Sequence, residues 1–113
     1  MKIIEVELNV QVGQSPNVLE VTIGDFQPGS HVWKKGIRPD IYPNPQSTIW
    51  TTTVRNAKGN YMYWTSAVLD RNPNTNWVSV DVAVNGEAIH TEELEYEAKK
   101  NQLVEFRITL NFI

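Results

Sequence analysis

The chain contains no cysteine among its 113 residues, so it forms neither a disulfide framework nor a thiolate metal site. It has only two histidines, His31 and His90, and neither stands in a metal-ligand spacing such as H-x-x-x-H. No stretch approaches the roughly 18 apolar residues of a membrane-spanning helix. The first residues, 1–5, alternate like a strand and do not resemble a signal peptide. We therefore expect no metal, no cofactor and no membrane anchor.

Positive charge is also scarce. The formal net charge is −3, which argues against a nucleic-acid partner because such proteins need a basic surface. It argues equally against docking on anionic lipid by charge alone. The one local basic cluster, Lys34, Lys35 and Arg38, is typical of a solvated loop. The sequence thus predicts a protein whose recognition surface does not depend on charge.

Alternation of apolar and polar residues dominates the chain. Residues 4–12, 18–25, 78–84 and 104–112 each place apolar side chains at every second position. This period indicates half-buried strands of antiparallel sheets, with one face in water. At this length the chain makes a single domain, residues 1–113. We predict an all-β fold, an antiparallel β-sandwich of seven or eight strands.

Turn residues agree with this fold. Asn85-Gly86 is a strong hairpin signal, and residues 56–60 form a looser one. The proline-rich run 38–45 cannot join a central strand ladder. Residues 91–100 break the alternation, with a threonine at the N-cap position, acids in the first turn and lysines in the last. This segment predicts one short helix.

Signals for catalysis are weak. The serines lack a nucleophile-elbow context, and no glycine-rich phosphate loop is present. We interpret His31 and His90 as surface or partly packed histidines. The carboxylates of residues 92–97 are typical of a solvated face, because like charges so close together need water. We therefore expect a protein that is not an enzyme.

Aromatic side chains favour a binding function. The chain has four tryptophans and four tyrosines, and Trp50 and Trp64 lie centrally in strand-like runs, where burial is expected. The rings near loops are the candidates for recognition: Trp33, Tyr42, Trp77 and Tyr96. Rings with one polar end favour membrane–water interfaces and attract quaternary ammonium groups, but they also stack on sugars. Composition alone leaves a lipid site and a glycan site equally open.

The segment from Ser66 to Trp77 runs from a probable strand through a polar loop to a tryptophan. Its sequence Asp70-x-Asn72-x-x-Thr75-Asn76-Trp77 resembles the D-x-N-x-x-S-N-W signature of actinoporins, the sphingomyelin-directed pore-forming cytolysins of sea anemones. Residues 92–96 are similar to the E-E-L-Y-Y segment of that family. The resemblance covers about residues 47–97. It implies that serine and tyrosine side chains hold a phosphocholine headgroup and that loop tryptophans enter the membrane interface.

Carried over by position, the resemblance assigns the headgroup serine to Ser66, the interfacial tryptophan to Trp77 and a helix tyrosine to Tyr96. The departures are Val68 in place of proline, Pro73 and Asn74 in place of two aromatics, and Thr91 and Glu95 in place of tyrosines. Most of the choline cage is therefore missing. Actinoporins also detach an amphipathic N-terminal helix, whereas residues 2–12 alternate like a strand.

Two further families offer comparisons. The spacing of Leu19, Trp33 and Pro43 resembles that of aegerolysins, small acidic β-sandwiches that bind membrane lipids, some as half of a binary insecticidal toxin. Fungal fruit-body lectins share the actinoporin-like sandwich and bind sugars.

We predict a membrane-lipid-binding protein of the pore-forming cytolysin type, released to act at target-cell membranes and needing a second protein component or homo-oligomerisation to perforate them. The alternative is a carbohydrate-binding lectin on the same sandwich. The predicted lipid- or glycan-binding residues are Ser66, Arg71, Asn72, Asn74, Asn76, Trp77, Tyr96 and Trp33.

Overall fold

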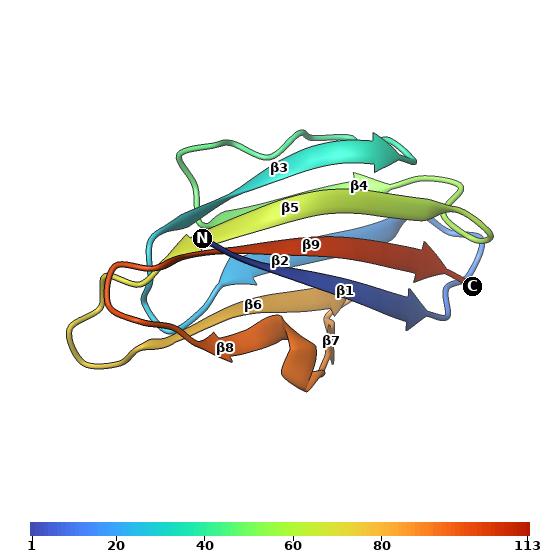
Figure 1. Cartoon of the computed structure of the whole chain (residues 1–113). Coiled ribbons are helices and arrows are strands. Elements are labelled where there is room, and N and C mark those ends of the chain that lie inside the picture. The colour runs from blue at the N-terminus through green and yellow to red at the C-terminus, as the bar shows by residue number, and fades with distance from the viewer.

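The computed structural model describes residues 1–113 as two β-sheets packed face to face (Figure 1). The elements are β1 (Lys2–Val10), β2 (Asn17–Ile23), β3 (Gly29–Gly36), β4 (Ile49–Val54), β5 (Tyr61–Leu69), β6 (Trp77–Val84), β7 (Glu87–Ile89), the 3₁₀ turn η1 (Glu92–Leu94), β8 (Glu95–Glu97) and β9 (Leu103–Phe112). One sheet has the order β1-β9-β5-β3, and the other has the order β4-β2-β6-β7 with β8 also paired to β6. The predicted all-β sandwich is confirmed, with short β7 and β8 raising the strand number to nine.

The short helix expected near residues 91–100 is a single 3₁₀ turn. Thr91 caps it as expected, since its side chain accepts a hydrogen bond from the Glu93 N–H at 3.3 Å. The next residues, Glu95–Glu97, form β8 and pair with β6 in the register Val78↔Tyr96. The acidic first turn indicated the helix start correctly. The helix does not continue beyond Leu94, because the next residues form backbone hydrogen bonds with the edge of β6 instead.

Most pairings are antiparallel, as predicted, but β1 and β9 run parallel from Lys2↔Val104 to Val10↔Phe112. The first and last strands of the chain therefore lie side by side in one sheet (Figure 1). A parallel pair needs a long connection, and here nearly the whole chain provides it. The amino-terminal segment is thus held along its full length by the carboxyl-terminal strand.

The core is made by the inward positions of the alternating strands. In β9, for example, every second residue from Val104 to Phe112 is buried, while the residues between them are partly exposed. Trp50 and Trp64 are buried, as the sequence predicted, and their rings meet edge to face at 5.7 Å. This geometry is favourable beyond the burial of the rings themselves.

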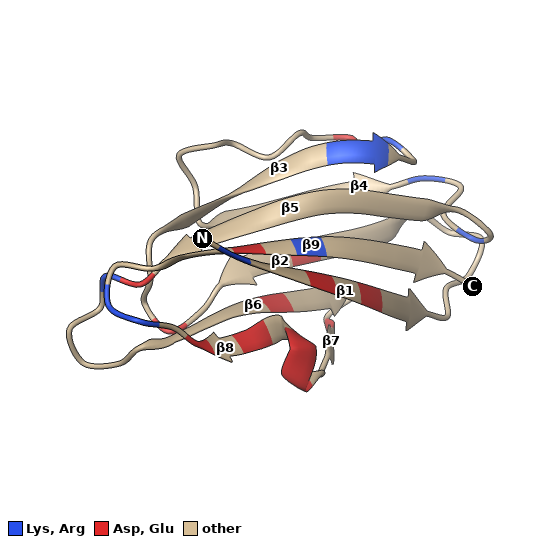
Figure 2. Cartoon of the chain, in the orientation of Figure 1, with Lys and Arg blue, Asp and Glu red and all other residues tan.

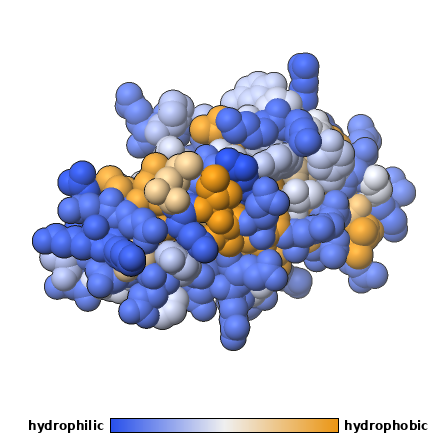
Figure 3. Space-filling model, viewed as in Figure 1, coloured by the Kyte–Doolittle hydropathy of each residue, from blue (hydrophilic) through white to orange (hydrophobic).

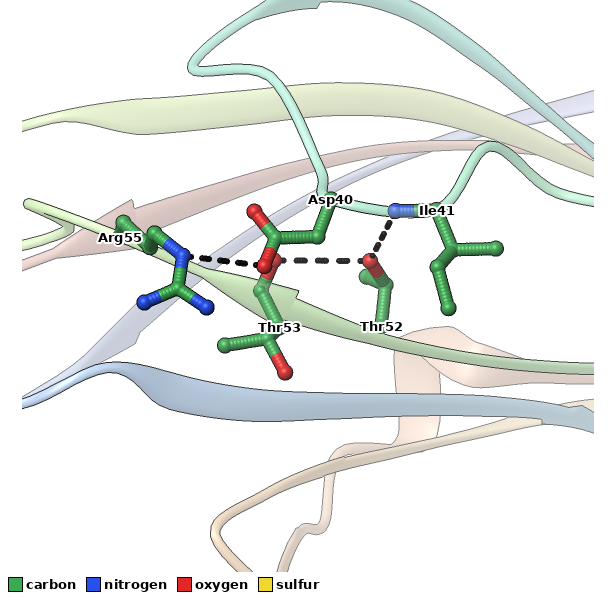
Figure 4. Close-up of polar contacts among 5 residues, drawn as sticks. All are labelled: Asp40, Ile41, Thr52, Thr53 and Arg55. Atoms are coloured by element: carbon green, nitrogen blue, oxygen red, sulfur yellow. Dashed lines mark hydrogen bonds and ion pairs between the residues drawn. The ribbon is translucent and has the colours of Figure 1, made fainter.

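The connection between β3 and β4 protects the outer edge of β4. The Asp40 N–H donates to the Thr53 carbonyl at 2.9 Å. The Ile41 N–H donates to the Thr52 hydroxyl at 2.9 Å (Figure 4). Arg55 also holds this connection in place, with an ion pair from its Nε to Asp40 Oδ2 at 3.0 Å. An edge strand with unpaired backbone groups can pair with a strand of another chain, and this connection covers part of the β4 edge.

The strands run lengthwise along the sandwich, so most loops gather at its two ends (Figure 1). Three of them meet at the end where β1 begins: residues 24–28, residues 70–76 and residues 98–102 (Figure 1). We call this the loop end. Lys99, Lys100 and Arg71 give it a local basic character, whereas η1 and β8 carry acidic side chains (Figure 2).

Candidate functional site

A buried glutamine organises the loop end. Gln27 is 3% exposed, and its side-chain Oε1 accepts hydrogen bonds from the backbone N–H groups of Arg71 (2.8 Å) and Asn72 (2.7 Å). Its Nε2 donates to Asp70 Oδ1 and to the Trp77 carbonyl, each at 3.0 Å. One side chain therefore fixes both ends of the 70–76 loop onto the turn that follows β2. This role could not be predicted from the sequence, because nothing in the local pattern around Gln27 marks it as buried.

The residues that resemble the actinoporin signature form hydrogen bonds that hold the 70–76 loop in its conformation. The Asn72 Oδ1 accepts from the Asn74 N–H at 3.0 Å, and its Nδ2 donates to the Asp25 carbonyl at 2.9 Å. The Thr75 hydroxyl accepts from the Trp77 N–H at 3.1 Å. Such local side-chain-to-backbone bonds are what asparagine and threonine supply in turns. The signature therefore shapes the loop, and the Asn72 side chain makes internal hydrogen bonds through both its oxygen and its nitrogen.

Phe26 is the most exposed large hydrophobic residue of the chain. Its side chain is 98% exposed, and both Asp25 (φ 55°) and Phe26 (φ 53°) adopt the left-handed conformation. That conformation is costly for residues other than glycine. Asp25 holds it in place, since its Oδ2 accepts from the Ser79 hydroxyl at 2.7 Å. The sequence reasoning overlooked Phe26, although a phenylalanine inside a Gly-Asp-Phe-Gln-Pro-Gly turn is itself an indication of exposure.

Trp77 is the second exposed ring at this end. It is the first residue of β6 and is 44% exposed, as its predicted role requires. Its backbone is tied to Thr75 and to Gln27, which directly follows Phe26 in the chain. One hydrogen-bond network thus presents both rings. We call Phe26 and Trp77 the aromatic tip.

A polar hollow lies within the same loops. It has a volume of about 190 Å³ and is lined by Asp70, Arg71, Asn72, Pro73, Asn76, Lys100 and Asn101. Arg71 and Lys100 supply positive charge, and the Oδ2 atom of Asp70 is buried without a hydrogen-bond partner. A buried polar atom without a partner is rare in folded proteins. The hollow can therefore accept an anionic group at Arg71 and Lys100, whereas the buried Asp70 Oδ2 lies beneath its surface.

Apolar side chains also reach the surface where β1 and β9 begin. Met1, Ile3 and Leu103 are exposed, and Ile3 lies opposite Glu105 in the β1–β9 ladder. Figure 3 shows hydrophobic groups breaking this otherwise hydrophilic face over the start of β1. The apolar surface near the loop end is thus larger than the aromatic tip alone.

Ser66, predicted to contact a headgroup, is fully buried in β5. Its hydroxyl accepts from Trp64 Nε1 at 3.2 Å and lies 2.7 Å from His31 Nδ1. The other ring nitrogen, Nε2, must carry a proton because it donates to the Thr48 carbonyl at 2.9 Å. Ser66 therefore donates to Nδ1, and the prediction of Ser66 as a ligand contact is corrected: a serine facing the core cannot reach a membrane or a glycan.

His31 is also more buried than the sequence indicated. It is 1% exposed, and burial lowers its pKa below the ordinary value, although the hydrogen bond to Thr48 opposes that shift. The His31–Ser66 pair has the spacing of a nucleophile and its base, but no substrate can reach two side chains this deep. The pair instead links β3 and β5 of one sheet to the residue that precedes β4 of the other.

The other predicted site residues lie in different surroundings. Trp33 packs against the core and against Tyr42, with ring centroids 5.6 Å apart, and its Nε1 is buried. Tyr96 is partly buried, with Lys2 Nζ 5.5 Å from its ring centroid. Both rings are thus partly covered by neighbouring side chains, and both lie outside the 70–76 loop. Arg71, Asn74 and Asn76 are exposed in the 70–76 loop, as predicted.

No helix of the chain is long and apolar enough to cross a membrane. Comparison with protein-family models, curated proteins and solved structures found no match. The assignment of a function therefore depends on the geometry of the loop end.

Proposed function

We propose that this protein binds the interface of lipid membranes through its loop end. The observation that carries the proposal is the aromatic tip: the Phe26 side chain is 98% exposed, Trp77 is 44% exposed, and the residue that follows Phe26, Gln27, donates a hydrogen bond to the Trp77 carbonyl. Exposed rings on a rigid loop lose little entropy on binding, and amphipathic rings favour the membrane–water interface.

The energetics suit reversible docking. A phenylalanine or tryptophan exposes about 150–250 Å² when free. Removing on the order of 100 Å² of each ring from water at about 25 cal/mol/Å² contributes roughly 5 kcal/mol in total. Each lysine or arginine close to an anionic surface adds about 1 kcal/mol. A single chain would therefore bind weakly, and tight binding would need several chains on one membrane.

The polar hollow provides a place for the lipid headgroup. A phosphate would lie between Arg71 and Lys100, which line the hollow. Exposed Asn74 and Asn76 flank the same loop. This headgroup geometry differs from the aromatic choline cage that the actinoporin resemblance implies.

A chain that docks through its loop end stays on one side of the membrane. Because β1 is paired along its length with β9, releasing an amino-terminal segment would break a nine-residue ladder. Any perforation would thus follow from oligomerisation or from a second protein component.

The test is co-sedimentation with vesicles of phosphatidylcholine alone, with added sphingomyelin, and with added phosphatidylserine. The Phe26→Ser/Trp77→Ser variant should lose at least tenfold in binding, because both rings leave the interface. Arg71→Ala and Lys100→Ala should weaken binding to phosphatidylserine vesicles most. Tyr61→Ala, a similarly exposed aromatic at the opposite end of the sandwich, is the matched control and should bind normally. Equal binding of the double variant, or no binding to any vesicle, would refute the proposal.

A further inference from the structure

We infer that the outer face of the β1-β9-β5-β3 sheet carries a second binding site, for a neutral carbohydrate, at the end away from the aromatic tip. A groove of about 560 Å³ lies there, lined by Glu7, Asn9, Lys58, Gly59, Asn60, Tyr61, Asn111, Phe112 and Ile113. Its volume falls in the range of about 300–1,000 Å³ that is usual for small-ligand sites.

Three side chains form a row across three strands of this face. Asn9 in β1 lies opposite Asn111 in β9, and Asn111 lies opposite Tyr61 in β5. Neighbouring strands are about 4.8 Å apart, so the row places an aromatic ring one strand away from an amide pair. Tyr61 is 42% exposed and lines the groove, so its side chain is accessible to a ligand there.

The amides are held in fixed orientations. Asn111 Nδ2 donates both to Glu7 Oε1 at 2.9 Å and to Asn9 Oδ1 at 3.0 Å. The remaining groups of this cluster are the Asn111 Oδ1 and Glu7 Oε2 acceptors and the Asn9 Nδ2 donor. A fixed set of donors and acceptors beside an aromatic ring matches a sugar, which presents hydroxyl groups at its edge and C–H groups on its face.

Charge balance favours a neutral ligand. Glu7 and Lys58 are the two ionisable groups with opposite charge that line the groove. The middle of the same face is occupied by Arg107, which pairs with Glu105 at 2.8 Å and with Glu5 at 3.9 Å. These ion pairs neutralise one another, and the opposite charges of Glu7 and Lys58 leave the side chains of the groove without a net charge. The right half of Figure 3 shows this surface as mainly hydrophilic.

The face also allows a chain of sugars. Tyr63 follows Tyr61 on the same side of β5, about 7 Å further along at 3.4 Å per residue. Lys35 lies over the Tyr63 ring, with Nζ 5.4 Å from its centroid. A ligand extending from the groove along β5 would meet this second ring after Tyr61.

Affinity electrophoresis in gels containing neutral glucan, mannan, galactan or xylan, followed by calorimetry with oligosaccharides of the retained polymer, tests the inference. At least one polymer should retard the protein. Tyr61→Ala should weaken binding at least tenfold, whereas Tyr61→Phe should stay within about threefold because the ring remains. Asn9→Ala, on the surface of β1, tests the amide pair and should also weaken binding severalfold. Thermal unfolding of each variant verifies the fold.

Phe26→Ser is the matched control and should bind the polymer normally, so that this inference can fail while vesicle binding succeeds, and the reverse. Retardation by none of the neutral polymers would overturn the inference, as would retention of the polymer by both Tyr61→Ala and Asn9→Ala. Binding restricted to anionic polysaccharides would overturn it as well.

Discussion

The side-chain amide of Gln27 donates a hydrogen bond to the buried carboxylate of Asp70 at 3.0 Å, joining two loops that are 43 residues apart. The same glutamine accepts hydrogen bonds from the backbone N–H groups of the two residues that follow Asp70. This contact sets the position of the 70–76 loop relative to Phe26. It is the basis of the proposed docking surface.

Replacing Gln27 with alanine should therefore destabilise the fold. The substitution leaves two backbone N–H groups and the Asp70 carboxylate without partners, and each buried polar group left unsatisfied costs about 1–3 kcal/mol. We expect a loss of roughly 3 kcal/mol in the free energy of unfolding, measured by urea denaturation. Gln46→Ala, in an exposed loop, should change it by less than about 0.5 kcal/mol. A near-neutral Gln27→Ala would show that the loop holds its position without this network.

Phe26 should lower the free energy of unfolding while it strengthens binding to vesicles. Its left-handed backbone (φ 53°) costs a non-glycine residue roughly 1–2 kcal/mol, and its exposed ring contributes no core packing. Phe26→Gly should raise the free energy of unfolding by up to about 1 kcal/mol, since the added entropy of the unfolded chain offsets part of the gain. The same variant should bind vesicles more weakly. Reduced stability of Phe26→Gly would mean that the ring has a structural role.

His31 should make stability depend on pH. Since its pKa is lowered by burial in the folded chain, the unfolded chain takes up a proton first as the pH falls. This contribution to stability is fully present above the unfolded pKa of about 6.5 and is lost below it, at no more than about 1.4 kcal/mol per pH unit. NMR titration of the folded protein should give an imidazole pKa for His31 below 6.5. A value at or above 6.5 would contradict the buried, neutral ring.

The fold was largely predictable because it depends on the alternation of side chains. Val104 to Phe112 and Val78 to Val84 bury the side chains that their period-two pattern selects. The parallel pairing of β1 with β9 was not predictable, since each strand carries the same alternation in either orientation. The strand Glu95–Glu97 was hidden because its local residues favour a helix, and only the edge of β6 decides between the two.

The site was less predictable than the fold. Trp77 was found from its place at a loop, and exposure agrees with that prediction. The prediction for Ser66 was wrong because a position close to the loop suggested an exposed side chain. Its hydroxyl instead belongs to a buried hydrogen-bond network with His31 and Trp64. The role of Gln27 was not predictable, because it depends on a contact with a loop more than 40 residues away. The exposure of Phe26 was predictable from the turn in which it lies.

Quenching of tryptophan fluorescence by brominated lipids tests the central claim most directly. Trp50 and Trp64 are buried, whereas Trp77 is half exposed at the aromatic tip, so a bromine atom in the upper acyl chain should quench chiefly Trp77 when the protein binds. We predict stronger quenching by lipids brominated near the headgroup than by lipids brominated near the bilayer centre, and loss of most of this quenching in a Trp77→Phe variant that still binds. Membrane binding with no quenching of Trp77, or quenching that persists unchanged in Trp77→Phe, would contradict the proposed docking through Phe26 and Trp77.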